Sequence, residues 1–183
     1  KRDAEGIPRA WVKNIKTTLK RLGFAFSSNR MVAEYTDRFY LNADRDCGNL
    51  RAHEYALSRE MATWRRKVRD NWGKIRVIKL NTDFGGEFLR TGDEVGIAAE
   101  INLGDLSPDD VAVELYHGPV DDREVISSGL IEKMEVQNSS NGVHAYRGTM
   151  ICQYAGRYGF ALRVVPGHYA LPHHLIPGLV LWA

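Results

Sequence analysis

The chain has 183 residues, of which 44% are apolar and 26% are charged, close to the averages of soluble globular proteins. No apolar run approaches the roughly 20 residues that a membrane-spanning helix needs, so we expect no membrane contact. The two cysteines, Cys47 and Cys152, exclude a disulfide framework, and a cytoplasmic location is the simplest expectation. The opening residues 1–7 contain neither Met nor a signal-peptide core, which predicts that the chain begins inside a longer one.

The net charge of +2 hides opposite charges in the two parts of the chain. Residues 1–80 contain 19 Lys and Arg against 9 Asp and Glu, whereas residues 81–183 contain 6 against 14. The basic residues are spread around expected helices and do not form a block with interleaved aromatic side chains, so we expect no nucleic-acid binding. An alternative role is an electrostatic latch between the two parts, which salt would screen beyond about 8 Å.

Helices are expected in the first part of the chain, where apolar residues recur at steps of three and four. A first helix is predicted over residues 8–23, and a second starts at a cap, either Ser27 or Ser28, and ends near residue 41. The polar tract 42–49 is predicted to break the pattern. A long helix then ends near residue 73, and its apolar stripe is interpreted as core: Leu57, Met61, Trp64, Val68 and Trp72.

Strands are expected from residue 74 onward, because the apolar period changes from 3.6 to 2. Turn-forming residues separate several short alternating runs, which is typical of a sandwich. We therefore predict an α+β chain with two domains. Residues 1–73 form a helical tail and connecting helix, and residues 74–183 form an antiparallel, immunoglobulin-like β-sandwich. The clearest alternating run is Val95, Ile97, Ala99, Ile101 and Leu103.

Histidines and paired aspartates are the first candidates for metal binding and for acid–base catalysis. His168, His173 and His174 are potential metal ligands, but their proline-rich surroundings predict a loop in which neighbouring imidazoles face different ways. The carboxylate pairs Asp109-Asp110 and Asp121-Asp122 resemble the acid and base of a glycosidase in type only. Both pairs lie in expected turns, where aspartate caps the local backbone. We therefore expect neither metal binding nor catalysis from them.

Other chemical candidates also receive structural interpretations. Cys47 has Arg45 nearby but no identifiable histidine partner, so it is expected to be an incidental thiol. Gly85-Gly86 lies in an expected hairpin, and no glycine-rich loop joins a strand to a helix as a phosphate site requires. Trp64 and Trp72 lie at helical spacing and are expected in the core.

Exposed aromatic residues of the β part leave open the binding of a glycan. The candidates for such a flat surface are Tyr116, Tyr146, Tyr154 and Tyr169, whereas Tyr158 alternates with core residues and is expected to be buried.

Three consecutive segments of the helical part carry a resemblance to a known family. They are Phe26-Ser-Ser-Asn-Arg30, Met31-Val-Ala-Glu-Tyr35 and Phe39-Tyr40. Together they resemble the C-terminal helix motif of the glycogen and starch phosphorylases, in which Phe-Ser-Ser-Asp-Arg leads into Ala-Gln-Tyr and an aromatic pair. Asn29 stands where the family has Asp, and residues 42–62 match no motif.

Both ends of the chain are similar to the bacterial and archaeal branch of that family. The upstream matches are Arg2-Asp3, Gly6-Ile7-Pro8, Trp11 and Lys16, with Ile15 where the branch often has Met. The downstream matches, to an additional β-domain, are Gly156-Arg-Tyr-Gly-Phe160, Arg163-Val-Val-Pro166, His168 and Leu181-Trp-Ala183.

The resemblance implies a parent enzyme with two Rossmann-like domains that releases glucose 1-phosphate from α-1,4-glucans. It also implies that pyridoxal phosphate is the parent's cofactor, bound by a lysine that precedes this fragment. We therefore expect no catalytic, cofactor-binding or metal-binding residue here, and expect the upstream catalytic domains as partners. A homo-oligomer stays open. The competing hypothesis is a free-standing glycan-binding or protein-interaction module.

Overall fold

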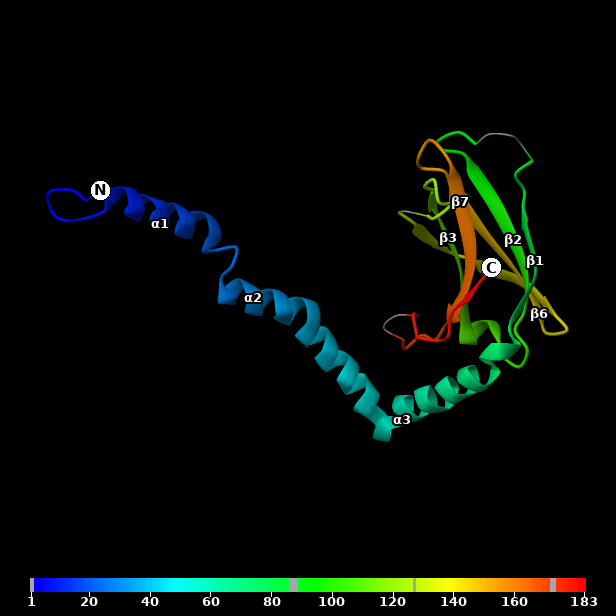
Figure 1. Cartoon of the computed structure of the whole chain (residues 1–183). Helices are drawn as coiled ribbons and strands as arrows, with labels where there is room; N and C mark the ends of the chain where they lie inside the picture. The colour runs from blue at the N-terminus through cyan, green and yellow to red at the C-terminus, as the bar shows by residue number, and fades with distance from the viewer. Residues whose placement is uncertain (1, 86–88, 127, 172–173) are drawn as a thin grey trace. The chain divides into compact units, whose positions relative to one another are not determined.

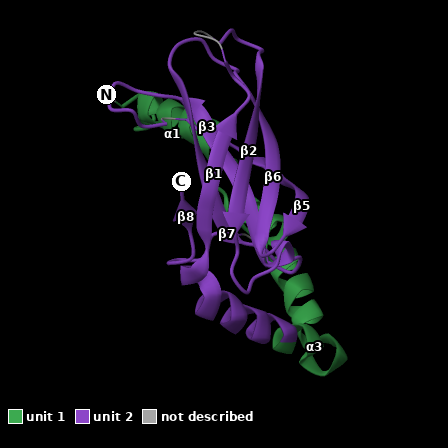
Figure 2. Ribbon diagram, turned by 90° about the vertical axis from the view of Figure 1, so that its right-hand side faces the viewer, with its two compact units in different colours: residues 1–59 green, residues 60–183 purple. Residues whose placement is uncertain are grey.

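The computed structural model describes residues 2–85, 89–126, 128–171 and 174–183. The chain forms two compact units, which we call the helical unit, residues 1–59, and the β unit, residues 60–183 (Figure 2). Helices and two antiparallel sheets are both present, so the α+β class is confirmed. None of the helices in the described ranges is both long enough and apolar enough to cross a membrane.

The helical unit is a succession of helices (Figure 1). These are α1 (Arg9–Leu22), α2 (Ser28–Tyr35), the π-helical turn η1 (Thr36–Tyr40) and the first half of α3 (Leu41–Asn71). The start of α1 after Pro8 agrees with the sequence prediction. Of the two predicted caps of α2, Ser27 is the one used, because its Oγ accepts the backbone N–H of Arg30 at 3.2 Å.

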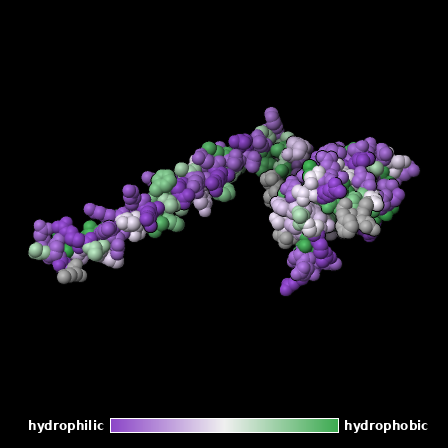
Figure 3. Space-filling model, turned by 90° about the horizontal axis from the view of Figure 1, so that it is seen from above, coloured by the Kyte–Doolittle hydropathy of each residue, from purple (hydrophilic) through white to green (hydrophobic). Residues whose placement is uncertain are grey.

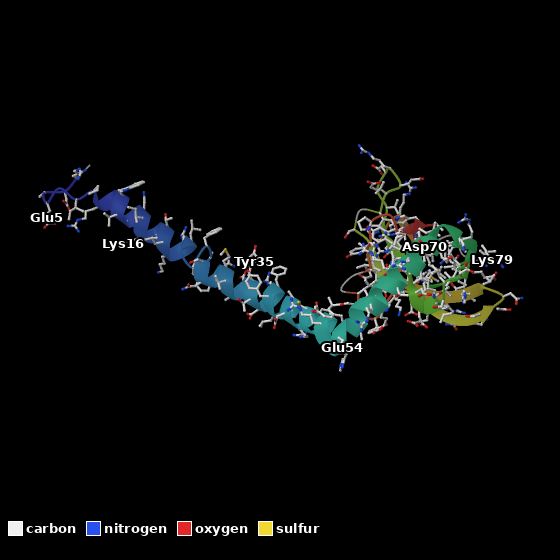
Figure 4. The ribbon with its side chains drawn as sticks, turned by 90° about the horizontal axis from the view of Figure 1, so that it is seen from below. Glu5, Lys16, Tyr35, Glu54, Asp70 and Lys79 are labelled. Carbon is white, nitrogen blue, oxygen red and sulfur yellow. The ribbon has the colours of Figure 1, made fainter. Side chains whose placement is uncertain are left out.

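The predicted break over residues 42–49 is wrong, because α3 begins at Leu41 and continues through this tract. Polar residues that face water do not end a helix unless proline or a competing cap interrupts the backbone bonds. The break lies instead at Ala52–Tyr55, where His53, Glu54 and Tyr55 have φ of 49°, 54° and 63°. Glu54, labelled in Figure 4, lies in this break. Left-handed backbone costs L-residues roughly 1–2 kcal/mol each, so it separates two helical segments.

The β unit contains two four-stranded sheets in which every strand pair is antiparallel. The first has the order β1-β2-β6-β5, with β1 Arg76–Thr82, β2 Glu94–Asn102, β6 Val143–Ile151 and β5 Glu135–Ser140. The second has the order β4-β3-β7-β8, with β4 Leu130–Lys133, β3 Val111–Pro119, β7 Tyr158–Pro166 and β8 Leu181–Trp182. Two short 3₁₀ turns precede β1 and β3, η2 (Trp72–Lys74) and η3 (Pro108–Asp110).

One hydrophobic core joins the two sheets, since alternate residues of β2 and β6 are buried together with residues of β3 and β7. The predicted run from Val95 to Leu103 supplies five buried residues. The second half of α3 also contributes, with Trp64 and Val68 buried and Met61 and Trp72 packed against the core. Most of the stripe interpreted as core in the sequence is therefore confirmed.

Candidate functional site

The described histidines near the C-terminus do not share a site. The ring of His168 packs against Trp64 with centroids 4.9 Å apart, and its Nε2 lies 3.4 Å from a carboxylate oxygen of Glu60. His174 lies elsewhere, with its Nδ1 3.7 Å from a carboxylate oxygen of Glu114. His168 thus helps to fasten α3 to the loop that follows β7.

His173 and Gly86 lie outside the described residues. Within the described ranges, no group of three or more His, Cys, Asp or Glu residues is arranged to hold a metal ion. Cys47 is half-buried in the helical unit, and Cys152 is buried in the β unit. Burial and, to a lesser extent, the Asp93 carboxylate raise the pKa of the Cys152 thiol, which disfavours the reactive thiolate.

One aspartate of each predicted pair, Asp110 and Asp121, has a structural role. Burial acts to raise the pKa of Asp110, but hydrogen bonds from Lys67 at 2.6 Å and from Ser107 outweigh it and hold the pKa below its ordinary value. Asp110 therefore stays ionised and joins α3 to the start of β3. Asp121 accepts the backbone N–H of Val125 at 2.9 Å and closes a turn. Asp110 and Asp121 are thus each held by donors of the surrounding protein.

The four candidate tyrosines do not form one surface. Tyr146 is buried, and burial raises its pKa to about 12. Tyr154 is exposed in the loop between β6 and β7. The hydroxyl of Tyr169 lies 3.1 Å from both carboxylate oxygens of Glu60. The ring of Tyr169 stacks on His168 with centroids 4.5 Å apart, whereas Tyr116 belongs to a separate cluster around Trp182.

That cluster lies on the outer face of the second sheet and centres on Trp182. The rings of Tyr116 and Trp182 meet edge to face, with centroids 5.9 Å apart and planes at 74°. Trp182 pairs with Arg163 across β7 and β8, and Tyr116 pairs with Ile131 across β3 and β4. Trp182 is 52% exposed and Ile131 is 51% exposed. We call Tyr116, Ile131, Arg163 and Trp182, with Glu114, the Trp182 platform.

An ion pair beneath Trp182 holds the platform in place. Arg163 Nε donates to Glu114 Oε2 at 2.6 Å, and the two side chains are only 11% and 12% exposed. The guanidinium carbon of Arg163 lies 5.7 Å from the centre of the Trp182 ring, within range of a cation–π interaction. The charges cancel, so the platform presents an apolar, aromatic surface without a net charge of its own.

The helical unit has a different kind of surface. None of the residues of α1 or α2 is buried, and Phe24 and Phe26 between them are 80% and 79% exposed. Hydrophobic side chains, green in Figure 3, accompany the charged ones along this unit. Isolated apolar residues at a surface are ordinary, whereas a repeated stripe of them forms an apolar surface along the helix.

Comparisons with known proteins give this architecture a family. The family described as the glycogen phosphorylase C-terminal domain matches residues 72–183. The chain belongs to this family. The matched range begins at Trp72, immediately before β1, and includes both sheets and the Trp182 platform.

Curated relatives extend the likeness to the helical unit. The maltodextrin phosphorylase of Thermococcus litoralis is 30% identical over 176 residues, which cover 94% of this chain and 20% of that protein. The glycogen phosphorylases of Mycobacterium bovis and Mycobacterium tuberculosis are each 28% identical over 183 residues, covering 100% of this chain and 21% of theirs. The chain thus spans about a fifth of the length of these relatives and corresponds to a C-terminal region of an α-glucan phosphorylase. No solved structure matches it significantly.

Lys16, Lys67, Lys74 and Lys79 lie in surroundings that do not fit a pyridoxal phosphate site. A Schiff-base lysine has to approach the ring of the cofactor inside a protected pocket. Lys67 and Lys74 are paired with aspartates, and Lys16 and Lys79, labelled in Figure 4, are exposed. A wide groove along α1 is lined by basic and small residues: Arg9, Val12, Lys13, Lys16, Thr17 and Lys20. It is open to water, so these surroundings do not protect an imine.

Sequence reasoning missed the central residue of the aromatic cluster. Trp182 was noticed only as part of a family-like ending, because β8 is two residues long and has no alternating pattern of its own. The signal available was the alternation in β7, which places Arg163 on the outer face opposite the buried Leu162 and Val164. A strand paired with β7 would present a residue beside Arg163.

Proposed function

We propose that this chain is the accessory part of an enzyme that uses inorganic phosphate to cleave α-1,4-glucans and release glucose 1-phosphate. The observation that carries the proposal is the family match to the β unit, supported by relatives named glycogen and maltodextrin phosphorylases that align with nearly the whole chain. The chemistry belongs to the parent enzyme, in which pyridoxal phosphate supplies the catalytic phosphate group. In this proposal the residues of this chain do not take part in the reaction and instead contact other domains of the enzyme.

The helical unit, in this proposal, packs against upstream catalytic domains with a Rossmann-like fold. Its support is the exposed apolar stripe of α1, which includes Trp11, Ile15 and Leu19. Burying such residues contributes roughly 1.5–3 kcal/mol for each large side chain. Packing of α1 against such a domain therefore buries its apolar stripe and stabilises the helix.

The β unit, in the same proposal, is an immunoglobulin-like sandwich that serves a cytoplasmic enzyme. Two antiparallel sheets sharing one core support the sandwich assignment. The compactness of the β unit also supports the second candidate, a free-standing module for binding glycans or proteins. Both candidates are compatible with a homo-oligomer.

The test is a phosphorolysis assay on the protein that contains this chain together with its upstream sequence. We expect glucose 1-phosphate from maltoheptaose and phosphate, and no product from the 183-residue chain alone. Absorbance of a reducible lysine imine would report the cofactor independently of turnover. A longer protein without the imine and without turnover would contradict the proposal and favour the free-standing module.

A second measurement tests the role of the helical unit. We expect a hydrophobic dye to bind the 183-residue chain, and expect this binding to fall with the substitution Leu19→Glu. Lys16→Glu is the matched control, since it changes the charge of α1 on its polar side. Equal dye binding by the chain and both variants would show that the stripe on α1 is not an accessible apolar surface.

A further inference from the structure

The Trp182 platform is fixed to the second sheet, and the Trp182 ring at its centre is half-exposed. Its ring lies on a strand whose backbone is fixed to β7, because Ala183 and Leu162 exchange two hydrogen bonds of 2.8 and 2.9 Å. The ring of Tyr116 lies directly over Gly129, where a Cβ atom would overlap it. Glycine at this position therefore allows Tyr116 to lie flat on β4 and to meet Trp182.

The electrostatics of the platform favour a neutral ligand. Glu114 and Arg163 neutralise each other at 2.6 Å and are largely shielded from water. An anionic ligand would have to compete with Glu114 for the guanidinium group, and a cationic ligand with Arg163 for the carboxylate. The exposed groups are the indole of Trp182 and the aliphatic side chain of Ile131, and the phenol of Tyr116 beside them is partly buried.

A glucose unit of an α-glucan has the chemistry that such a surface recognises. One face of the pyranose ring consists of C–H groups that pack on an aromatic ring, and its edge carries hydroxyl groups that exchange hydrogen bonds. Ligand sites in proteins typically combine an apolar, aromatic lining with a few fixed polar groups. The phenol of Tyr116, whose ring meets the indole, and the imidazole of His174, which lies 3.7 Å from Glu114, are polar groups of this part of the sheet.

We propose that the Trp182 platform is a glucan-binding surface, on which an α-1,4-glucan chain stacks a glucose unit against Trp182 beside Tyr116. The proposal rests on the proposed function for the identity of the sugar. Its role would be to hold a long glucan near the enzyme while another part of that glucan enters the catalytic site. Attachment of this kind raises the local concentration of chain ends without new catalytic contacts.

The test is a titration of the 183-residue chain with maltoheptaose, followed by calorimetry and by NMR shifts of the tryptophan indole N–H groups. We expect the Trp182 indole to shift, and expect Trp182→Ala to weaken binding by about tenfold or more, the size of a lost aromatic contact. Trp182→Leu keeps an apolar side chain on β8 and should weaken binding similarly while preserving the fold. Tyr154→Ala is the matched control, because Tyr154 is a half-exposed aromatic residue outside the platform and should leave affinity unchanged.

Three results with the 183-residue chain would overturn the proposal. They are no binding by the wild-type chain at millimolar maltoheptaose, equal binding by Trp182→Leu, or a dimer that dissociates on Trp182→Leu. The last result would make a second copy the occupant of the surface. In the longer protein, phosphorolysis of maltoheptaose by the wild type tests the proposed function by itself. A normal activity with no loss of glycogen affinity in Trp182→Leu would reject the platform and leave the proposed function intact.

Discussion

The helical unit and the β unit differ in whether their apolar side chains are buried. In the β unit, strands from two sheets enclose a core in which Ile97, Ile101 and Leu115 are fully buried. In the helical unit, α1 and α2 have clear apolar stripes and bury none of their residues. Amphipathic helices gain most of their stability from a packed face. The difference is that the β unit contains a packed core of its own, whereas α1 and α2 leave their apolar faces exposed.

The largest expected effect comes from introducing a Leu→Ala substitution in each of the two units and comparing the losses of stability. Leu162→Ala removes a fully buried side chain from β7 and should lower the free energy of unfolding of the β unit by about 2–5 kcal/mol. Leu19→Ala removes an exposed side chain from α1 and should change it by less than about 0.5 kcal/mol. Urea denaturation, followed by near-ultraviolet circular dichroism, measures both. An equal loss in the two variants would mean that α1 has a packed face after all.

A second test examines how α3 is fastened to the sheets. Lys67→Met leaves Asp110, whose side chain is 9% exposed, without its ammonium partner, and should cost about 1–3 kcal/mol. Lys74→Met removes a pair in which both side chains are exposed, and should cost no more than about 0.5 kcal/mol. Equal effects in these matched variants would contradict the role of Lys67 in joining α3 to the β unit.

The same pair predicts a dependence on pH. The pKa of Asp110 in the folded state lies below its ordinary value of 3.8, so folding favours the ionised form. The resulting stability is complete above pH 3.8 and is lost as the pH falls through the lower folded value. The difference between wild type and Lys67→Met should therefore shrink on acidification through this range. A difference that stays constant would assign the loss to packing of the lysine side chain.

Helices and strands could be predicted from the sequence wherever apolar residues recurred several times at one spacing. Val95 to Leu103 alternates over nine residues, and the structure buries its five apolar members. The stripe through Trp64 and Val68 was equally clear and joins the core. Such patterns are legible because burial on one face repeats with the geometry of the element itself.

The features that were missed depend on local backbone geometry or on distant pairing. His53, Glu54 and Tyr55 adopt left-handed φ, yet none is a glycine, so the sequence contains no signal for the break in α3. The polar tract before it was interpreted as the break because composition alone does not reveal whether solvent-facing residues stay helical. The position of Trp182 beside Arg163 depends on the register between β7 and β8, which cannot be predicted from a strand of two residues.

The smallest expected effect is that of Tyr146→Phe, which tests whether the β unit is stabilised by apolar packing alone. Tyr146 is buried between the sheets, and its hydroxyl has no hydrogen-bond partner among the described residues. Tyr146→Phe removes an uncompensated polar group and keeps the ring, so the free energy of unfolding at pH 7 should stay within about 1 kcal/mol of the wild type or rise. Leu162→Ala, by contrast, removes the packing itself.

Alkaline titration sharpens this last prediction. Burial and, secondarily, the Asp109 carboxylate raise the pKa of Tyr146 from 10.0 to about 12. The neutral phenol therefore contributes stability that is complete below pH 10 and is lost as the pH rises through the folded value near 12. Tyr146→Phe should flatten this part of the stability profile, measured by urea denaturation at each pH. A large loss in the free energy of unfolding at pH 7 in Tyr146→Phe would reveal a hydrogen bond of the phenol. Polar contacts as well as apolar burial would then hold the two sheets together.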